Sequence, residues 1–228
     1  MIPSLILFLR VGMSLENGAH GPLFPDGSFE YVPIPEKCEV DSSRSILFSQ
    51  IPARSGGTIE QFVPRRYRGT PAHYDPEFET STYGDPARNK RTQLLNLNCY
   101  DLLVFYAGLR PLSERQGSKL YIIGYFTVQK VYKMEMLEPW PAPGLQHLWA
   151  NAHFKRKNGD PNLVVVKGFP QGSRLLEKAV SVSDSHQKVL PDLENSLGLT
   201  GSLKRAGAGR WVPATHVAIV AEWLFTLG

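Results

Sequence analysis

The sequence predicts an α+β fold with a mixed, mainly antiparallel sheet and a few short helices. Two runs rich in β-branched and aromatic residues, 100–109 and 119–132, are separated by a polar segment, as in an antiparallel hairpin. The 20 glycines and 18 prolines are spread along the chain, which favours many short elements joined by shaped loops. Apolar residues with helical spacing occur only in short stretches, so strands and helices alternate irregularly.

The first predicted element is a buried strand at 5–11. Its apolar run is too short for a membrane span and has no basic segment before it, as a signal peptide would. Pro25-Asp26-Gly27 predicts a tight turn, because proline presets the first corner and glycine tolerates positive φ. A short strand at 28–32 should follow, and the hairpin of 100–109 and 119–132 comes later, in the middle of the sheet.

Two helices are predicted from apolar residues that recur at helical spacing. The core-facing residues of the first are Leu145, Leu148, Trp149 and Ala152. Those of the second, within 214–228, are Val217, Val220, Ala221 and Leu224. Between them we expect a buried strand at 162–168 and a short helix or turn at 173–179.

The composition limits the classes of function. With 42% apolar and 11% aromatic residues, 228 residues can bury a full core, and we expect a single domain over 1–228. Cys38 and Cys99 are far apart and form no C-x-x-C pair, which favours a reduced, cytoplasmic setting without a disulfide framework or thiolate zinc site. A net charge of +4 and a pI of about 9.0 favour an anionic partner. The glycine-rich loop after the first strand matches neither the Walker loop nor the G-x-G-x-x-G pattern, which disfavours nucleotide binding of those two kinds and leaves the cofactor unknown.

The segment "HYDPEFET" places His73, Asp75 and Glu77 at alternate positions. In an extended chain such residues share a face, although Pro76 disturbs the alternation. The trio can bind a metal ion, or pair a general base with the residue that orients it. The alternative is a solvated loop whose carboxylates cap turns, and we assign no metal ligands.

The segment "NAHFKRK" contains Asn151, His153, Lys155 and Arg156 at the expected end of the first helix. Cations there complement the helix dipole, which is the alternative to a binding role. Asn151 should stand over Lys155, one helical turn away, so that the amide and the ammonium hold an anion.

Two further features concern charge. Arg10 lies at the end of an apolar strand and needs a partner, for which Asp26 or Glu30 is the candidate. Basic and aromatic residues are interleaved at 65–68, 88–91 and 204–211, as suits single-stranded nucleic acid; the alternative is an ordinary charged surface.

These segments resemble a known family. "LFLRVG", "GPLFPDGSFEYVPIPE", "HYDPEFETSTYGD", "YDLLVFYAGL", "LYIIGYFTV", "NAHFKR" and "VVVKGFPQGSRLLEKAV" occur in this order and are similar to the nucleotide modification associated domain 3 family. The resemblance covers about 5–185 and leaves 186–228 as a C-terminal extension with the last helix. It implies a context of DNA or nucleotide base modification, and nucleic acid or a nucleotide as partner, without supplying a catalytic residue.

The polar residues within these segments are hard to place in a core. We expect them to gather in one cleft at the strand ends, with Lys155, Arg156 and Arg174 meeting an anion and His73 or His153 handling a proton. The predicted catalytic residues are His73, Asp75, His153 and Lys155. The predicted substrate-binding residues are Arg10, Asp26, Ser28, Glu30, Glu79, Tyr83, Asp85, Asn151, Arg156, Lys167, Ser173 and Arg174.

Two alternative functions stay open. The hairpin also resembles that of PUA-like modules, which are small barrels that hold a base, and this implies a non-catalytic reader of modified nucleic acid with a PUA-like barrel element. Its stacking residues would come from Tyr100, Tyr106, Tyr125 and Phe126. A metal-dependent hydrolase instead needs three ligands near one point, from among His73, Asp75, Glu79, Asp85 and His153.

Overall fold

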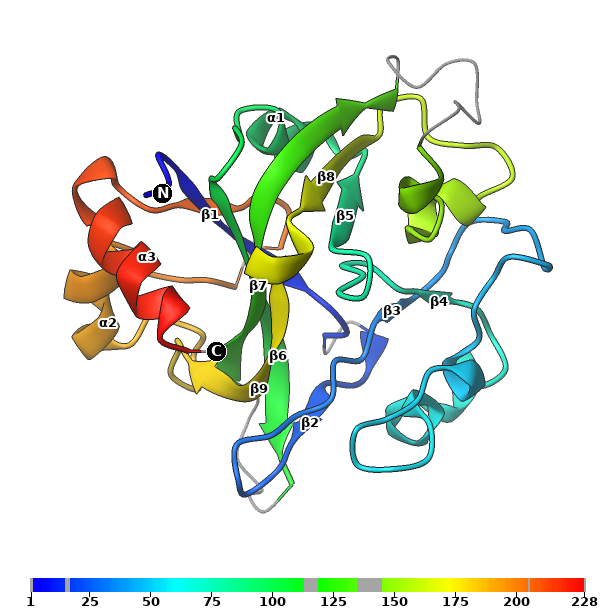
Figure 1. The fold of residues 1–228 in the computed structure, drawn as a ribbon. Coiled ribbons are helices and arrows are strands. Elements are labelled where there is room, and N and C mark those ends of the chain that lie inside the picture. The colour runs from blue at the N-terminus through cyan, green and yellow to red at the C-terminus, as the bar shows by residue number, and fades with distance from the viewer. Residues whose placement is uncertain (1, 15–16, 113–118, 135–144, 205, 228) are drawn as a thin grey trace.

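The protein is built around a central β-hairpin to which the other strands of the main sheet are added (Figure 1). The structure is a computed structural model, and it describes residues 2–14, 17–112, 119–134, 145–204 and 206–227. The class is α+β, with mainly antiparallel pairing, as predicted. The strands are β1 (Ile6–Val11), β2 (Gly21–Leu23), β3 (Ile34–Pro35), β4 (Ala72–His73), β5 (Thr82–Asp85), β6 (Leu102–Pro111), β7 (Lys119–Lys133), β8 (Val164–Gly168), β9 (Arg174–Ser181) and β10 (Arg210–Trp211). The α-helices in these residues are α1 (Arg88–Leu94), α2 (Pro191–Leu197) and α3 (Val217–Phe225).

The main sheet has the order β10-β1-β6-β7-β8-β5. β6 and β7 form the predicted antiparallel hairpin, and β1 runs parallel to β6. β7 has two partners on its second edge: β9 pairs along 121–125 and β8 along 128–133. This change of partner places β8, and β5 beyond it, at one end of the main sheet, on the side where the small antiparallel sheet of β3 and β4 lies in Figure 1.

The predicted PUA-like barrel is not found. The path of the main sheet ends at β10 on one side and at β5 on the other, so the described strands form an open sheet. The predicted strand at 28–32 is also wrong, because Ser28 and Phe29 each form only an isolated bridge. The turn before it is confirmed, with Gly27 at φ 87° and its N–H bonded to the Phe24 carbonyl.

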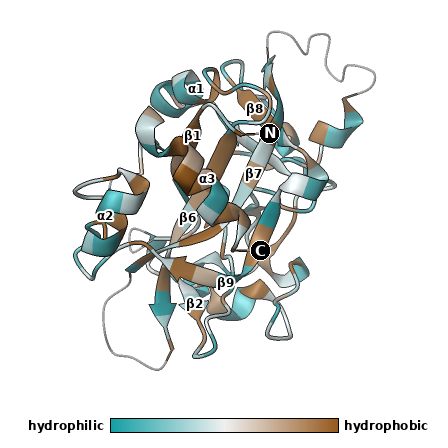
Figure 2. Cartoon of the chain, turned by 60° about the vertical axis from the view of Figure 1, so that its left-hand side comes forward, coloured by the Kyte–Doolittle hydropathy of each residue, from teal (hydrophilic) through white to brown (hydrophobic). Residues whose placement is uncertain are grey.

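The last helix is confirmed. Figure 2 shows α3 beside the apolar strands of the sheet. Its buried residues belong to the same apolar core as β1, β6 and β7. They are the predicted set of Val217, Val220, Ala221 and Leu224.

Two predicted elements are wrong. The helix expected from Leu145 to Ala152 is replaced by two 3₁₀ helices, Gln146–Leu148 and Ala152–Lys155, because the chain turns at Asn151 and bends Phe154 into a separate small core with Leu148 and Leu163. The segment expected to be a short helix or turn at 173–179 is strand β9, since the open edge of β7 supplies hydrogen-bond partners for it.

Candidate functional site

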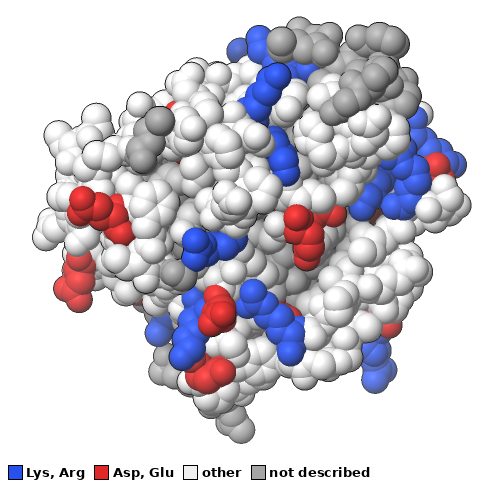
Figure 3. All heavy atoms as spheres, in the orientation of Figure 1, with Lys and Arg blue, Asp and Glu red and all other residues white. Residues whose placement is uncertain are grey.

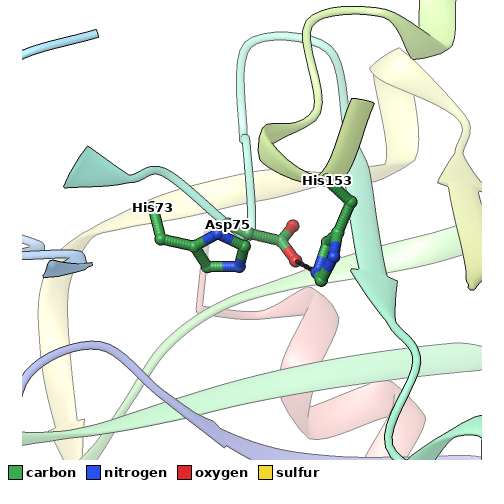
Figure 4. Close-up of side chains that lie close together, drawn as sticks. All are labelled: His73, Asp75 and His153. Atoms are coloured by element: carbon green, nitrogen blue, oxygen red, sulfur yellow. Dashed lines mark ion pairs between the residues drawn. The ribbon is translucent and has the colours of Figure 1, made fainter. Parts of the chain in front are cut away.

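Two histidines and an aspartate meet between the two sheets. Figure 4 shows the Asp75 carboxylate pointing to His153, with His73 beside it. One donor atom from each of the three side chains lies within 4.8 Å of the others. His153 Nε2 is 3.6 Å from Asp75 Oδ2, and the rings of His73 and His153 meet edge to face at 4.7 Å. All three residues are buried.

The three side chains come from elements that the fold holds in place. His73 ends β4, where it is opposite Ile34 of β3. Asp75 follows, and its carbonyl accepts a hydrogen bond of 2.6 Å from the Tyr31 hydroxyl. His153 lies in the 3₁₀ helix Ala152–Lys155, which packs against β5. Its Nε2 is 3.1 Å from the Gly84 carbonyl of β5.

Asp75 is a buried carboxylate with two hydrogen-bond donors. Its oxygens accept from the Gly84 N–H at 3.0 Å and from Asn151 Nδ2 at 2.9 Å. Burial raises the pKa of Asp75 well above its ordinary value, against the effect of these two hydrogen bonds. Asn151 also caps the 3₁₀ helix, because its Oδ1 accepts from the His153 N–H at 3.2 Å. This amide therefore holds Asp75 and His153 together.

A second layer of charged groups lies behind the imidazoles. His73 Nδ1 is 2.7 Å from Glu36 Oε2, and His153 Nδ1 is 2.7 Å from Asp160 Oδ2. Arg156 joins the two carboxylates, with a bidentate contact to Glu36 at 3.0 and 3.2 Å and one of 2.8 Å to Asp160. Burial acts to raise the pKa of Glu36, but its bonds with His73, the Cys38 N–H and Arg156 hold it well below the ordinary value. The hydrogen bond from His153 likewise lowers the pKa of Asp160.

Burial has the opposite effect on His153. It lowers the pKa of this imidazole below the ordinary value, although the hydrogen bond with Asp160 opposes the change. Nearby His73 and Arg156 lower it further. The neutral imidazole is therefore the favoured form, available as a base or as a metal ligand.

The His73, Asp75 and His153 side chains line a cavity of about 790 Å³. Lys and Arg side chains gather with acidic ones around the hollowed middle of the face in Figure 3. The cations that line the cavity are Arg10, Lys37, Lys90 and Lys204. Lys90 pairs with Asp85 at 3.0 Å. Within the described parts of the chain, the Lys37 and Lys204 ammonium groups have no carboxylate within 4.0 Å.

The fold brings part of the predicted site together at this cavity. The predicted residues that line it are Arg10, His73, Asp75, Tyr83, Asp85 and His153. Asn151 and Arg156 contact this set from behind. Arg10 donates to Gln187 Oε1 at 3.2 Å and to the Lys204 carbonyl at 2.6 Å. Its predicted carboxylate partners have other donors: Asp26 accepts from Ser28, and Glu30 from the N–H groups of Arg54 and Ser55.

A second group of predicted residues lies outside the cavity. Glu77 turns away from His73 and Asp75 and accepts a hydrogen bond from the Thr80 hydroxyl, and Lys167 donates to the Thr80 carbonyl. Lys155 lines a neighbouring cavity of about 510 Å³, and burial lowers its pKa. The expected stacking of Asn151 over Lys155 is wrong, because the 3₁₀ helix begins after Asn151.

The remaining predicted residues have structural contacts elsewhere. Glu79 accepts from the Tyr74 hydroxyl at 3.0 Å, and the Ser173 hydroxyl accepts from the Thr127 N–H at 3.2 Å. The Arg174 guanidinium lies 5.8 Å from the centre of the Tyr125 ring, and Arg174 does not line the cavity. Of the expected anion-binding cations, Arg156 is paired with two carboxylates.

The stacking residues expected of a base reader lie mostly in the core. Tyr106, Tyr125 and Phe126 are buried there, and Tyr100 stacks on Phe169 at 5.1 Å. Within the described residues, Tyr83 is the one tyrosine, phenylalanine or tryptophan that lines the 790 Å³ cavity.

Sequence reasoning missed several residues of the site. Glu36 and Asp160 were not selected, although Glu36 ends the quoted "YVPIPE" segment and Asp160 follows "HFKRKNG". Lys37 and Lys204 were not selected for the cavity either. Gly84, within "TYGD", brings its backbone to Asp75 and His153. The signal for Asp160 was an acidic residue shortly after a histidine, and Lys204 lies in the basic segment 204–211, which the sequence indicated only as a nucleic-acid contact.

The sequence model of nucleotide modification associated domain 3 matches residues 5–222. The chain belongs to this family. The match extends beyond the segments quoted above and includes β10, which pairs with β1, and Gln187 and Lys204, which line the cavity. No curated protein and no solved structure matches the chain.

The family name associates the chain with nucleotide modification. Among the described residues, no helix has both the length and the apolar character that a membrane crossing requires.

Proposed function

We propose that this member of the nucleotide modification associated domain 3 family is an enzyme that acts on a nucleotide or on a base of nucleic acid. The substrate enters the 790 Å³ cavity with its phosphate towards Lys37, Lys204 and Arg10 and its reacting group towards His73, Asp75 and His153. A base within DNA is the substrate form that the family context favours. The two free cysteines support a reducing, cytoplasmic setting.

The observation that carries the proposal is a buried group of ionisable side chains in a cavity lined by cations. A volume of about 790 Å³ lies within the range of about 300–1,000 Å³ of small-molecule sites. Shifted pKa values gather here in residues of opposite type, Asp75 upwards and His153 downwards, as is common where protons are transferred.

The same cavity favours an enzyme over a reader of modified bases. A protein that only binds modified bases needs a pocket with aromatic side chains on which a base can stack, and its histidines need not lie close together. Here Tyr106, Tyr125 and Phe126, three of the four candidate stacking residues, are in the core, while two imidazoles and a carboxylate meet at one point.

The test is to incubate the protein with single-stranded DNA, RNA and a panel of nucleotides, with and without divalent metal, and to follow binding and change of substrate mass. We expect a mass change with at least one substrate. Asp75→Asn should abolish it while leaving binding within severalfold of wild type, because the cations that hold the phosphate are unchanged.

Binding is tested with the double variant Lys37→Ala/Lys204→Ala. Two lost phosphate contacts worth about 0.5–1 kcal/mol each should weaken binding roughly 5–30-fold. If the ligand is nucleic acid, the slope of log affinity against log salt concentration should become shallower by about two, one for each lost phosphate contact. The matched control is Lys119→Ala/Lys133→Ala, which removes the same charge from residues that do not line the cavity.

If both double variants lose the same amount of affinity, binding depends on the net charge of the protein and not on Lys37 and Lys204. That result would contradict the placement of the phosphate. Tight binding by wild type without any mass change would overturn the enzyme and support the reader.

A further inference from the structure

The geometry points to a metal site that the family description does not assign: we propose that His73, Asp75 and His153 bind one divalent transition-metal ion at the inner end of the 790 Å³ cavity. The catalytic role of the ion rests on the proposed function, because the ion would lie in the same cavity as the substrate. Binding of the ion is independent of that function and can be measured without a nucleotide.

The donor set and its spacing suit such an ion. Two imidazole nitrogens and one carboxylate are the ligands of many three-ligand zinc and iron sites. An ion with bonds of about 2.1 Å in a tetrahedral arrangement holds its donors about 3.4 Å apart. His153 Nε2 and Asp75 Oδ2, at 3.6 Å, are already near that separation, and no pair of the three donors is more than 4.8 Å apart.

Each imidazole is oriented as a metal ligand. Metal-bound histidines usually donate their second N–H to a carboxylate, which fixes the tautomer and raises the basicity of the ligating nitrogen. Glu36 takes this place at Nδ1 of His73 and Asp160 at Nδ1 of His153, both at 2.7 Å. Nε2 of each ring is then left for the ion. Arg156 holds both carboxylates, so one guanidinium fixes the whole outer layer.

The surroundings of His153 Nε2 call for a cation. Because a carboxylate only accepts, the 2.7 Å contact with Asp160 requires the proton on Nδ1 of the neutral imidazole. The lone pair on Nε2 then faces the Gly84 carbonyl oxygen, which only accepts, at 3.1 Å, and lies 3.6 Å from Asp75 Oδ2. A metal ion between Nε2 and Asp75 would accept this lone pair and bind the deprotonated carboxylate.

The nitrogen ligands select the kind of ion. Mg²⁺ and Ca²⁺ prefer an all-oxygen shell, whereas Zn²⁺, Fe²⁺ and Co²⁺ accept imidazole. Three protein ligands leave coordination positions that face the cavity, where the ion would supply Lewis-acid chemistry and a bound water.

The test uses the full chain in a Cys38→Ser/Cys99→Ser background, which removes the two exposed thiols as competing ligands. Stripped protein is titrated with Zn²⁺ and Co²⁺ by calorimetry and absorption spectroscopy, and with Mg²⁺ and Ca²⁺ for comparison. We expect one tight equivalent of Zn²⁺ or Co²⁺, a tetrahedral or five-coordinate Co²⁺ spectrum, and no tight binding of Mg²⁺ or Ca²⁺.

Ligand variants and outer variants should differ. His73→Ala, Asp75→Asn and His153→Ala should each abolish the tight equivalent, whereas Glu36→Gln or Asp160→Asn should weaken it about 10–100-fold. The matched control is His147→Ala, which removes a histidine outside the site. Circular dichroism of each stripped variant shows whether it is folded. If a ligand variant does not fold, the weaker metal binding expected of Asp160→Asn still tests the site.

Failure of folded wild-type protein to bind Zn²⁺ or Co²⁺ would overturn the metal site, as would tight binding that survives all three ligand variants. Metal binding without nucleotide binding would refute the proposed function and leave the metal site standing. Turnover that persists in stripped protein with a chelator would refute the catalytic role of the ion and leave the enzyme standing.

Discussion

Replacing Asn151 with alanine is the sharpest test of how the site is held together. The side chain is fully buried and serves two groups at once: Nδ2 donates to Asp75 at 2.9 Å, and Oδ1 accepts from the His153 N–H at 3.2 Å. Asn151→Ala removes both contacts without adding a group that can replace them.

The expected cost follows from these contacts. A hydrogen bond between neutral groups contributes about 0.5–1.5 kcal/mol, and an unsatisfied buried N–H costs about 1–3 kcal/mol. Together they predict a loss of roughly 2–4 kcal/mol in the free energy of unfolding, from a total of about 5–15 kcal/mol. At about 2–4 °C per kcal/mol for a chain of this size, the Tm should fall by roughly 4–16 °C.

The assay is urea unfolding followed by far-UV circular dichroism, with Tm from a thermal scan. Asn98→Ala is the matched control, since Asn98 is exposed and its amide makes only a 3.4 Å contact with the Asn96 carbonyl. It should change the free energy of unfolding by less than about 0.5 kcal/mol. Asn151→Asp keeps the size but places a second carboxylate beside Asp75, and should be no more stable than Asn151→Ala. A loss below about 1 kcal/mol for Asn151→Ala would refute the reasoning.

Three further predictions concern the surroundings of the site and the core. In Gly84→Ala the new Cβ would lie 2.8 Å from His153 Cδ2, so the free energy of unfolding measured in urea should fall by about 1–3 kcal/mol and nucleotide binding should weaken. An unchanged free energy of unfolding and unchanged binding would contradict this close approach. Arg156→Ala removes the guanidinium that Glu36 and Asp160 share and should cost about 1.5–3 kcal/mol by the same assay. Arg156→Lys should rescue little of this loss, because lysine cannot make the bidentate contact. Burial raises the pKa of Tyr106 to about 12 from 10.0. Because the folded-state pKa is the higher one, the stability linked to it is complete below about pH 10 and is lost as the pH rises to 12. Tyr106→Phe should therefore gain on wild type by up to about 2.7 kcal/mol between pH 9 and pH 12 in urea unfolding, and a constant difference would rule this out.

The elements predicted from sequence are those with a strong local pattern. The hairpin of β6 and β7 has β-branched and aromatic residues along its length, and α3 buries the four residues that helical spacing selected. Such patterns lie within one segment of the chain, so they can be recognised without knowing what the segment packs against. The same spacing was misleading at Leu145 to Ala152, where Asn151 caps a 3₁₀ turn and tertiary packing of Phe154 overrides the helical pattern.

The site was predicted in parts. His73, Asp75 and His153 were selected as polar residues of the segments that resemble the family, and the structure places them, with Arg10, around one cavity. The carboxylates behind the imidazoles were not predicted. Glu36 and Asp160 lie close to the predicted segments in sequence, but only the tertiary fold places each of them against an imidazole.

The sequence by itself determined the class of fold, the central hairpin, the last helix and the candidates for the chemistry, because hydrophobic period and residue type act over short distances along the chain. Only the tertiary structure decided which candidates meet. Pairing of β7 with β8, and of β8 with β5, forms one wall of the site, and the Asn151 amide joins it to Asp75 after β4. Such pairing between distant segments depends on contacts that no single segment contains.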